Sequence, residues 1–326
     1  MREFNAVVWG LGPHAIRNII PALQHCPGIR LYGICSRRSD LVSKHAAELG
    51  CLGWSDSAEM LENSRIDIVY VSTPIGLHAS HGTSVLLANK HLWCEKPLAG
   101  SEAQVLTLVG LSREHGLTLA EGYMYLYHPQ FLYLKDLLDS EALGQLRNVT
   151  CRFGIPPLER AGFRNDPDLG GGAFLDVGSY LISAVTALFP ESAPTVVFSR
   201  IDAEPGSRVD HRGRAILQYE SGTYVNLEWG INCSYRNEID LWGSMGSVSS
   251  ERFFSKPADH LPRFRFLDLN GRESYRTGLA GNHFVNMFEA FRVLVDDPVR
   301  AETERAMIAR RAHLMKDVIQ GSNLRR

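Results

Sequence analysis

The chain has 326 residues, which is long for a single hydrophobic core and favours two domains. Hydrophobic residues make up 44% and charged residues 21%, which excludes a disordered or fibrous chain. The formal net charge of −2 excludes the basic surface that holds a nucleic acid backbone. No basic leader is visible, and no apolar stretch approaches the roughly 20 residues of a membrane-spanning helix. We therefore expect a cytoplasmic protein that binds a small molecule, without nucleic acid or membrane partners.

The first element is an apolar strand at residues 6–9, followed by a turn of the pattern Gly-x-Gly-x-x-Ala and a helix. Gly10 lets the chain turn sharply, and Gly12 lets the backbone approach a pyrophosphate, which the N–H groups of the helix start then bind. A plain strand-to-helix turn is the alternative, but this order of elements favours a dinucleotide site that includes Pro13 and His14.

The strand at residues 29–35 ends in Ser36, Arg37 and Arg38, where an NAD-selective site usually has an acidic residue. A hydroxyl and two guanidinium groups suit a 2′-phosphate, because arginine offers planar, permanently charged donors to phosphate oxygens. We therefore expect NADP as the cofactor. NAD is the alternative if Arg37 and Arg38 are only solvated loop residues.

Two further strands, at residues 66–72 and 92–94, alternate with helices, which predicts a parallel sheet covered on both faces. Ligands bind at the carboxyl ends of such strands. The residues that follow these two strands are therefore expected at the cofactor site: Thr73, Pro74, His78, Glu95 and Lys96. His78 and His81 stand three apart, but no third ligand follows at a suitable spacing, so no metal site is expected.

The pattern changes after residue 145 to strand-like runs separated by turn signals, which predicts a sheet domain. The runs lie at residues 146–153, 195–201, 214–219, 223–231, 238–242 and 264–269. Helices are expected at residues 173–188, 282–295 and 302–319. The first of these helices places Asp176 and Tyr180 on one face, because they are four residues apart. Aromatic residues alternate at period two in residues 121–130, which predicts a strand there.

These motifs together resemble the Gfo/Idh/MocA oxidoreductases. They are the glycine turn, Thr-Pro at residues 73–74 with His78, Glu-Lys-Pro at residues 95–97, and the glycine-rich helix start at residues 170–180. The resemblance spans nearly the whole chain. It implies an α/β fold with a Rossmann domain at residues 1–122 and a substrate domain at residues 123–326. The second domain has a large, mostly antiparallel sheet with one open face, through which a homodimer or homotetramer forms.

The resemblance also implies roles for single residues. Lys96 lies beside the nicotinamide, and Arg164 reaches the cofactor. Members similar to inositol dehydrogenase have histidine four residues after the aspartate, whereas this chain has Tyr180, as do members in which tyrosine donates or accepts the proton. Residues 236–244 look most like the branch of nucleotide-sugar 3-ketoreductases. Candidate substrate contacts are Tyr123, Tyr127, His128 and Tyr235.

Hydride exchange with C4 of a nicotinamide requires that the protein position one carbon atom and manage one proton. In ketone reduction Tyr180 would protonate the nascent alkoxide while Lys96 stabilises its charge, and in oxidation the roles reverse. Asp176 either binds a substrate hydroxyl or holds Lys96 in place. The sequence thus predicts an NADP-dependent reductase of a keto-sugar, free or nucleotide-linked. The alternatives are a sugar or trans-dihydrodiol dehydrogenase and a non-catalytic NAD(P)-binding sensor.

Overall fold

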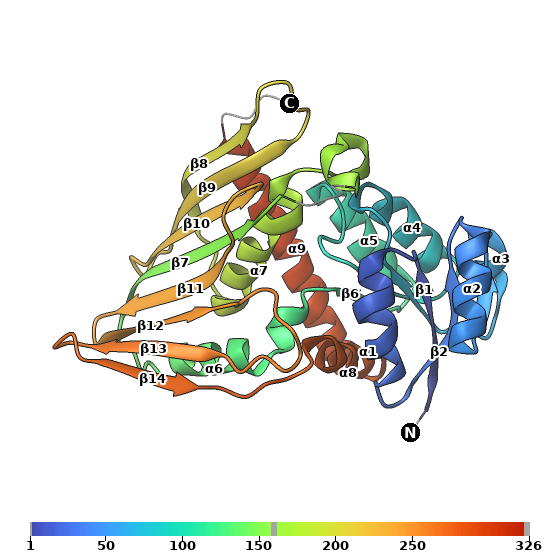
Figure 1. Ribbon diagram of the computed structural model, residues 1–326, viewed down its shortest axis with the longest axis horizontal. Coiled ribbons are helices and arrows are strands. Elements are labelled where there is room, and N and C mark those ends of the chain that lie inside the picture. Colours follow the sequence, from blue (N-terminus) through green and yellow to red (C-terminus); the bar gives the residue numbers. More distant parts are fainter. Residues whose placement is uncertain (1, 158–161, 323–326) are drawn as a thin grey trace. The chain divides into compact units, whose positions relative to one another are not determined.

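The computed structural model describes residues 2–157 and 162–322, and their contacts group the chain into two compact units. The first unit comprises Met1–Tyr123 and Phe284–Ala309, and the second comprises Met124–His283 and Arg310–Arg326. Figure 1 labels most of the helices and strands along the chain. Their bounds are β1 (Phe4–Trp9), η1 (Ala15–Ile19), α1 (Ile20–Gln24), β2 (Ile29–Cys35), α2 (Ser39–Leu49), β3 (Leu52–Trp54), α3 (Ser57–Glu62), β4 (Ile68–Val71), α4 (Ile75–Leu87), β5 (His91–Cys94), α5 (Glu102–Glu114), β6 (Leu119–Glu121), η2 (Met124–Tyr127), α6 (Pro129–Asp139), β7 (Leu146–Ile155), η3 (Gly162–Asn165), η4 (Pro167–Leu169), η5 (Phe174–Gly178), α7 (Ser179–Leu188), β8 (Thr195–Ala203), β9 (Asp210–Gln218), β10 (Tyr224–Ile231), β11 (Arg236–Gly243), β12 (Gly246–Glu251), β13 (Arg263–Asp268), β14 (Glu273–Thr277), α8 (His283–Asp296) and α9 (Pro298–Gln320).

The first unit contains a six-stranded sheet in the order β3-β2-β1-β4-β5-β6, and all its neighbouring strands are parallel. This is the strand order of a doubly wound dinucleotide-binding fold. All four residues of β4 are buried, as expected for a strand that is covered on both faces. The predicted Rossmann fold is therefore confirmed.

Helices from distant parts of the sequence cover the two faces of this sheet. Leu92 and Trp93 are neighbours in β5 and therefore point to opposite faces. The Leu92 side chain lies against Gly82 of α4, where an added Cβ would come within 2.8 Å of it. Trp93 packs instead against Phe288 and Phe291 of α8, with ring centroids 5.8 and 5.5 Å away. The C-terminal helix α8 thus completes the core of the N-terminal sheet.

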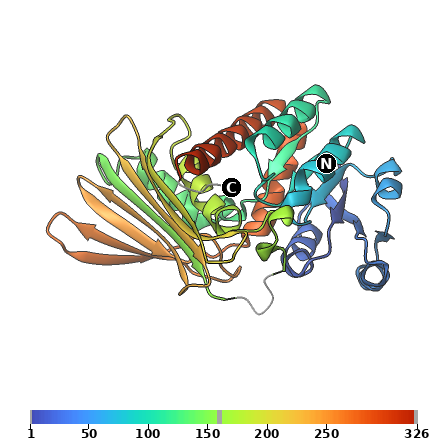
Figure 2. The ribbon, with the colours of Figure 1, turned by 90° about the horizontal axis from the view of Figure 1, so that it is seen from above.

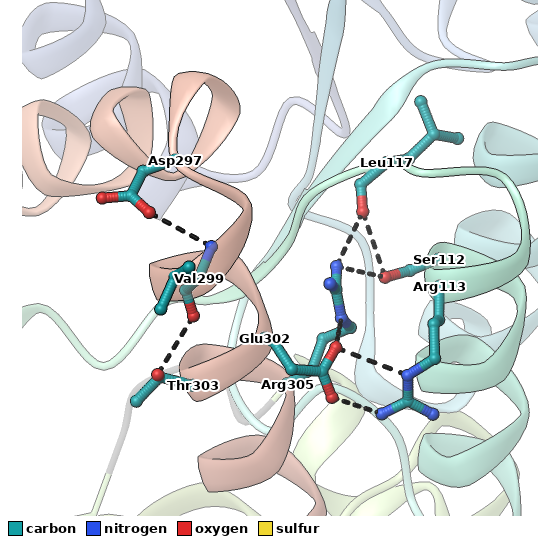
Figure 3. A network of polar contacts seen from close by, with 8 residues as sticks. All are labelled: Ser112, Arg113, Leu117, Asp297, Val299, Glu302, Thr303 and Arg305. Carbon is teal, nitrogen blue, oxygen red and sulfur yellow. Dashed lines mark hydrogen bonds and ion pairs between the residues drawn. The ribbon is translucent and has the colours of Figure 1, made fainter.

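A polar network attaches α9 to α5 in the same unit (Figure 3). The buried guanidinium of Arg305 donates to the carbonyl of Leu117 at 3.1 Å and to the Ser112 hydroxyl at 3.4 Å. Glu302 accepts from Arg305 at 2.9 Å and from Arg113 at 2.6 Å. These contacts explain why residues 284–309 group with the first unit, whereas the expected division of the chain at residues 122 and 123 assigns them to the second domain.

The second unit contains an eight-stranded sheet in the order β14-β13-β12-β11-β7-β10-β9-β8. Only β10 and β7 pair in parallel, so the expected mostly antiparallel sheet is confirmed. One face carries a continuous row of buried cross-strand neighbours: Ser199, Ala215, Leu227, Cys151, Ile239, Ser250 and Phe264. The helices of the unit lie on this face, and in its described part no helix covers the other face (Figure 2).

The segment Pro167–Leu188 is long and apolar enough, by length and composition, to cross a membrane. This differs from the expectation that no apolar stretch approaches that length. However, 89% of the most apolar window is buried inside the protein. The segment therefore belongs to the core of the second unit. Its helix α7 packs against β7.

The structure corrects the prediction of a strand at residues 121–130. Strand β6 ends at Glu121, a 3-10 turn follows at Met124–Tyr127, and α6 begins at Pro129. The Nδ1 atom of His128 accepts the backbone N–H of Gln130 at 2.9 Å and so caps α6. A proline at the first helical position is typical of such a start. The alternating tyrosines are therefore not on one strand face. Four short strands, β3, β6, β12 and β14, were also absent from the prediction.

Candidate functional site

The glycine turn after β1 has the geometry of a ligand-binding loop. Gly10 has φ +115°, and a Cβ there would lie 2.4 Å from the carbonyl oxygen of Ser72, so only glycine fits. A Cβ on Gly12 would meet no protein atom within 4 Å. The side of the turn at Gly12 is therefore open, which fits a pyrophosphate approaching the backbone. Pro13 and His14 open the helix, which continues as the π-helical turn η1.

The end of β2 is joined to the glycine turn by an arginine. The guanidinium of Arg38 donates to the carbonyl of Leu11 at 2.7 Å, and the Ser36 hydroxyl accepts the Arg38 backbone N–H at 3.4 Å. Arg37 is exposed beside them. Arg38 therefore contacts the glycine turn directly, while the binding of a 2′-phosphate by Ser36, Arg37 and Arg38 stays a prediction.

Glu95 places a largely buried carboxylate directly after β5, with 14% of its side chain exposed. Its Oε1 atom accepts from the Tyr70 hydroxyl at 2.6 Å and lies 3.0 Å from Nε2 of His14. Burial raises the pKa of this carboxyl, but the ion pair and hydrogen bond with His14, the Tyr70 hydroxyl and the nearby Lys96 outweigh burial and lower the pKa to about 2. Glu95 is therefore ionised and links the glycine turn to the Glu-Lys-Pro turn.

Lys96 lies between residues that are fixed by hydrogen bonds on both sides. Glu95 precedes it, and the carbonyl of Pro97 follows it at 2.9 Å from Nδ1 of His78. The backbone N–H of Leu98 donates to the buried carboxylate of Glu121 at 2.7 Å. Sequence reasoning missed Glu121, because its partner lies 23 residues away and no local pattern connects them. The backbone of Lys96 is thus held in a defined position.

His78 is buried directly beside the Glu-Lys-Pro turn, and its expected contact with the cofactor stays a prediction. Its side chain is only 1% exposed, and its two ring nitrogens lie 2.9 and 2.8 Å from the carbonyls of Pro97 and Thr73. The ring is therefore occupied within the protein. Pro74 is the N-cap residue of α4. The Thr73 hydroxyl lies 3.1 Å from Nδ1 of His81, whose pKa is lowered to about 4 by burial and then by His78 and Arg37.

In the second unit, Arg164 and Asp176 form an ion pair. Nε of Arg164 donates to Oδ2 of Asp176 at 2.6 Å, and the Asp176 side chain is 8% exposed. A Cβ on Gly171 would come within 2.5 Å of the Arg164 carbonyl, so this close approach requires a glycine. The Nε atom of Arg164 is thus directed to Asp176, and the expected contact of Arg164 with the cofactor stays a prediction.

Asp210 is a second buried carboxylate at the same glycine-rich segment. It begins β9, and its Oδ2 atom accepts the backbone N–H of Phe174 at 2.7 Å. Gly172 has φ +115°, and a Cβ there would lie 2.2 Å from Oδ1 of Asp210. Asp210 thus fixes the start of the helix that carries Asp176. The sequence offered no signal for this contact, because the two partners are 36 residues apart.

Tyr180 is 8% exposed and is surrounded by aromatic rings. The ring centroids of Phe153, Tyr125 and Phe254 lie 5.3, 5.9 and 6.0 Å from its own. The helix is not regular in this region. The π-helical turn η5 spans Phe174–Gly178 and includes Asp176, whereas Tyr180 lies in the following helix α7. Such π-helical turns occur frequently at functional sites.

The four expected substrate contacts differ in exposure. Tyr123 and His128 are fully buried, and Tyr127 is partly buried. Tyr235 is 46% exposed, and its hydroxyl accepts from the buried amide of Asn237 at 2.9 Å. The guanidinium carbon of Arg252 lies 6.0 Å from the Tyr235 ring centroid. Tyr235 is therefore a fixed aromatic surface beside a cation.

Residues 4–123 match the oxidoreductase family with an NAD-binding Rossmann fold, and residues 131–249 match the GFO/IDH/MocA C-terminal domain. The fold and the two matches define a nicotinamide-dinucleotide-dependent oxidoreductase. The chain belongs to the Gfo/Idh/MocA family.

Two reductases and one crystal structure are similar to three quarters or more of the chain. A dTDP-3,4-didehydro-2,6-dideoxy-alpha-D-glucose 3-reductase from Saccharopolyspora spinosa is 36% identical over 252 residues, 77% of this chain and 76% of the relative. The reductase of the same name from Streptomyces violaceoruber is 31% identical over 334 aligned positions, 99% of this chain and 97% of the relative. The crystal structure of a 3-ketoreductase from Actinomadura kijaniata with NADP and TDP-benzene matches with a TM-score of 0.92 at 30% identity, covering 98% of each chain.

The Glu95 network generates a prediction about acid stability. A carboxyl with a lowered folded-state pKa stabilises the fold above its unfolded pKa, and this stabilisation is lost as the pH falls towards the folded value of about 2. We expect Glu95→Gln to remove a pH-dependent contribution of about 3 kcal/mol to the free energy of unfolding. Urea unfolding at pH 5, 4 and 3 measures it. Glu62→Gln, at an exposed position, is the control, and an unchanged acid slope in Glu95→Gln would contradict the assignment.

Proposed function

We propose that this protein is an NADP-dependent reductase of the C3 ketone of a nucleotide-linked sugar. The observation that carries the proposal is the match, over 98% of the chain, to a 3-ketoreductase solved with NADP and TDP-benzene. That protein was also solved as a tyrosine-to-phenylalanine variant and a lysine-to-alanine variant. Its substituted lysine and tyrosine are separated by the same number of residues as Lys96 and Tyr180 here.

Lys96 and Tyr180 are the proposed catalytic residues. When bound, the reduced nicotinamide supplies the hydride that reaches the carbonyl carbon. Tyr180 donates its hydroxyl proton to the carbonyl oxygen, and the ammonium of Lys96 stabilises the negative charge that develops there. Asp176, oriented by Arg164, accepts a hydrogen bond from a sugar hydroxyl. The rigid backbone around Lys96 and the π-helical turn before Tyr180 support these roles.

The choice of NADP rests on the end of β2. Arg38 is held at the glycine turn by its 2.7 Å hydrogen bond to Leu11, and Arg37 is exposed next to it. Guanidinium groups favour a 2′-phosphate, whereas an NAD-selective site offers a carboxylate to the ribose hydroxyls.

The nucleotide part of the substrate is assigned to Tyr235 and Arg252. Tyr235 lies directly before β11, and Arg252 directly follows β12, its antiparallel neighbour. An exposed aromatic ring suits stacking with a base, and a guanidinium suits a diphosphate. Arg252 also has φ +48°, a conformation that is uncommon outside glycine and is found at functional sites.

Two alternatives remain distinguishable by assay. A sugar or trans-dihydrodiol dehydrogenase is supported by a D-xylose 1-dehydrogenase (NADP(+)) from Haloferax volcanii that is 31% identical over 68% of this chain. Such an enzyme would reduce NADP with a sugar or diol. A non-catalytic sensor would bind NADPH tightly and turn over no substrate.

The catalytic assignment predicts the behaviour of two variants. With NADPH and a dTDP-linked 3-keto-sugar, we expect Lys96→Ala and Tyr180→Phe each to lower kcat by about 100-fold or more, because each removes charge stabilisation or the proton donor. The rate of loss of NADPH absorbance measures it. Tyr219→Phe, at another buried tyrosine, and Lys44→Ala, at an exposed lysine, are the controls and should retain activity.

Near-normal turnover in both catalytic variants would contradict the roles of Lys96 and Tyr180. Turnover of free keto-sugars at the same kcat/KM as nucleotide-linked ones would contradict the substrate class.

The cofactor assignment predicts a selective loss of affinity. We expect Arg37→Ala to raise the Kd for NADPH by about tenfold, because a charge-assisted hydrogen bond to phosphate is lost, and to leave the Kd for NADH unchanged. Fluorescence titration with both cofactors measures it. Arg30→Ala, near the other end of β2, is the matched control. A preference for NADH that survives Arg37→Ala would contradict the assignment.

The open face of the second sheet supports a homodimer or homotetramer. Tyr224 and Trp242 flank Asn148 on adjacent strands, and both aromatic side chains are exposed, by 43% and 60%. An apolar surface on an uncovered sheet face marks an interaction site. We expect light scattering after size exclusion to give twice or four times the chain mass of 36.3 kDa, and Trp242→Glu to dissociate the assembly. A monomeric unchanged protein at micromolar concentration would contradict this surface.

A further inference from the structure

The buried ring of His78 lies between two backbone carbonyl oxygens. Nδ1 is 2.9 Å from the oxygen of Pro97, and Nε2 is 2.8 Å from the oxygen of Thr73. Both distances are those of good hydrogen bonds. A carbonyl oxygen only accepts hydrogen bonds, so each contact requires a proton on the ring nitrogen.

A neutral imidazole carries one N–H and one lone pair. It would satisfy one carbonyl and direct its lone pair at the other oxygen, which is repulsive at this distance. We propose that His78 is an imidazolium that donates to both carbonyls and acts as a positioning residue for Lys96. Both acceptors are backbone carbonyls of the protein itself. This positioning role is therefore separate from the cofactor contact that the sequence predicts for His78.

The charged groups around His78 act in opposite directions. Burial is the largest influence and lowers the pKa of the ring below its ordinary value, while the carbonyls of Pro97 and Thr73 and the carboxylate of Glu95 oppose this lowering and Lys96 adds to it. His81, one turn further along α4, is the other titratable group beside the ring, and its own pKa is lowered by burial and by His78. The N-terminal end of α4 also disfavours a cation. The two carbonyl acceptors and the ionised Glu95 are the contacts that favour the charged ring against its burial, so the proposal rests on the geometry of the two short contacts.

The charged ring holds two segments of backbone together. Thr73 follows β4 and Pro97 follows Lys96, so one ring joins the ends of two neighbouring strands of the sheet. Together with the Glu121 bond to Leu98, this contact fixes the backbone directly after Lys96. Loss of either donor would free one carbonyl and allow the Glu-Lys-Pro turn to shift. The effect on turnover rests on the proposed function of Lys96, whereas the protonation state of His78 does not.

Nitrogen NMR of the unchanged full-length protein labelled with 15N-histidine tests the protonation state directly. We expect both ring nitrogens of His78, assigned through its own backbone resonances, to be protonated at pH 7 and to remain so at pH 8, where exposed histidines are neutral. His91 is the internal control, because its Nδ1 accepts the backbone N–H of Thr118 at 3.0 Å and must therefore be unprotonated. An unprotonated ring nitrogen on His78 at pH 7 would overturn the proposal.

A kinetic measurement tests the positioning role. The amide of a glutamine donates to one carbonyl but presents its own oxygen elsewhere, so His78→Gln keeps one contact at most. We expect kcat with NADPH and the keto-sugar to fall by about 10- to 100-fold, with a much smaller change in the Kd for NADPH. His91→Gln is the control, at a partly buried histidine of β5 whose ring is bound to Thr118.

A normal kcat in folded His78→Gln would overturn the positioning role. If that variant does not fold, or if no reductase activity is found, the NMR measurement on the unchanged protein still decides the charge of His78. Absence of activity with a confirmed imidazolium would count against the proposed function alone.

Discussion

The cofactor half of the structure depends on one buried negative charge. A carboxylate buried without partners is strongly unfavourable, so Glu95 requires donors that reach it from other elements. Tyr70 comes from β4 and His14 from the turn after β1, while Glu95 itself directly follows β5. The charge therefore joins the carboxyl ends of three parallel strands. Because these ends carry the ligand-binding residues in such sheets, the same interaction that stabilises the loops also aligns them for a dinucleotide.

The second unit uses the same physical solution at its own helix start. Asp176 is paired with Arg164, and Asp210 receives the N–H of Phe174, so two carboxylates organise one glycine-rich segment. Positions 171 and 172 require glycine, because backbone and carboxylate oxygens occupy the space where a Cβ would lie. In each unit a π-helical turn follows a glycine-containing turn closely. The turn η1 comes after the glycine turn at residues 10–12, and η5 comes after the glycines at 171 and 172.

Local pattern was enough to predict the parallel N-terminal sheet with its glycine turn and a strand-rich second domain, whereas the mostly antiparallel order of the second sheet and the roles of Lys96 and Tyr180 came from the family resemblance. It failed where the deciding contact is distant in sequence. Glu121 and Asp210 find their partners 23 and 36 residues away, and no spacing rule indicates such pairs. The strand predicted at residues 121–130 was wrong because the tyrosine alternation outweighed the helix start signal of Pro129. The catalytic roles themselves stay predictions, since a motif shows which groups are present but not what they do.

The return of α8 to the first unit has a consequence for the order in which the protein folds during synthesis. The six-stranded sheet is complete at Glu121, yet the face that carries Trp93 is covered by Phe288 and Phe291. For the time in which the ribosome adds more than 150 residues, this aromatic face has no native partner. Exposed apolar surface of this kind promotes aggregation of partly folded chains. A fragment that ends after β6 therefore retains the dinucleotide motif but lacks the helix that closes its core.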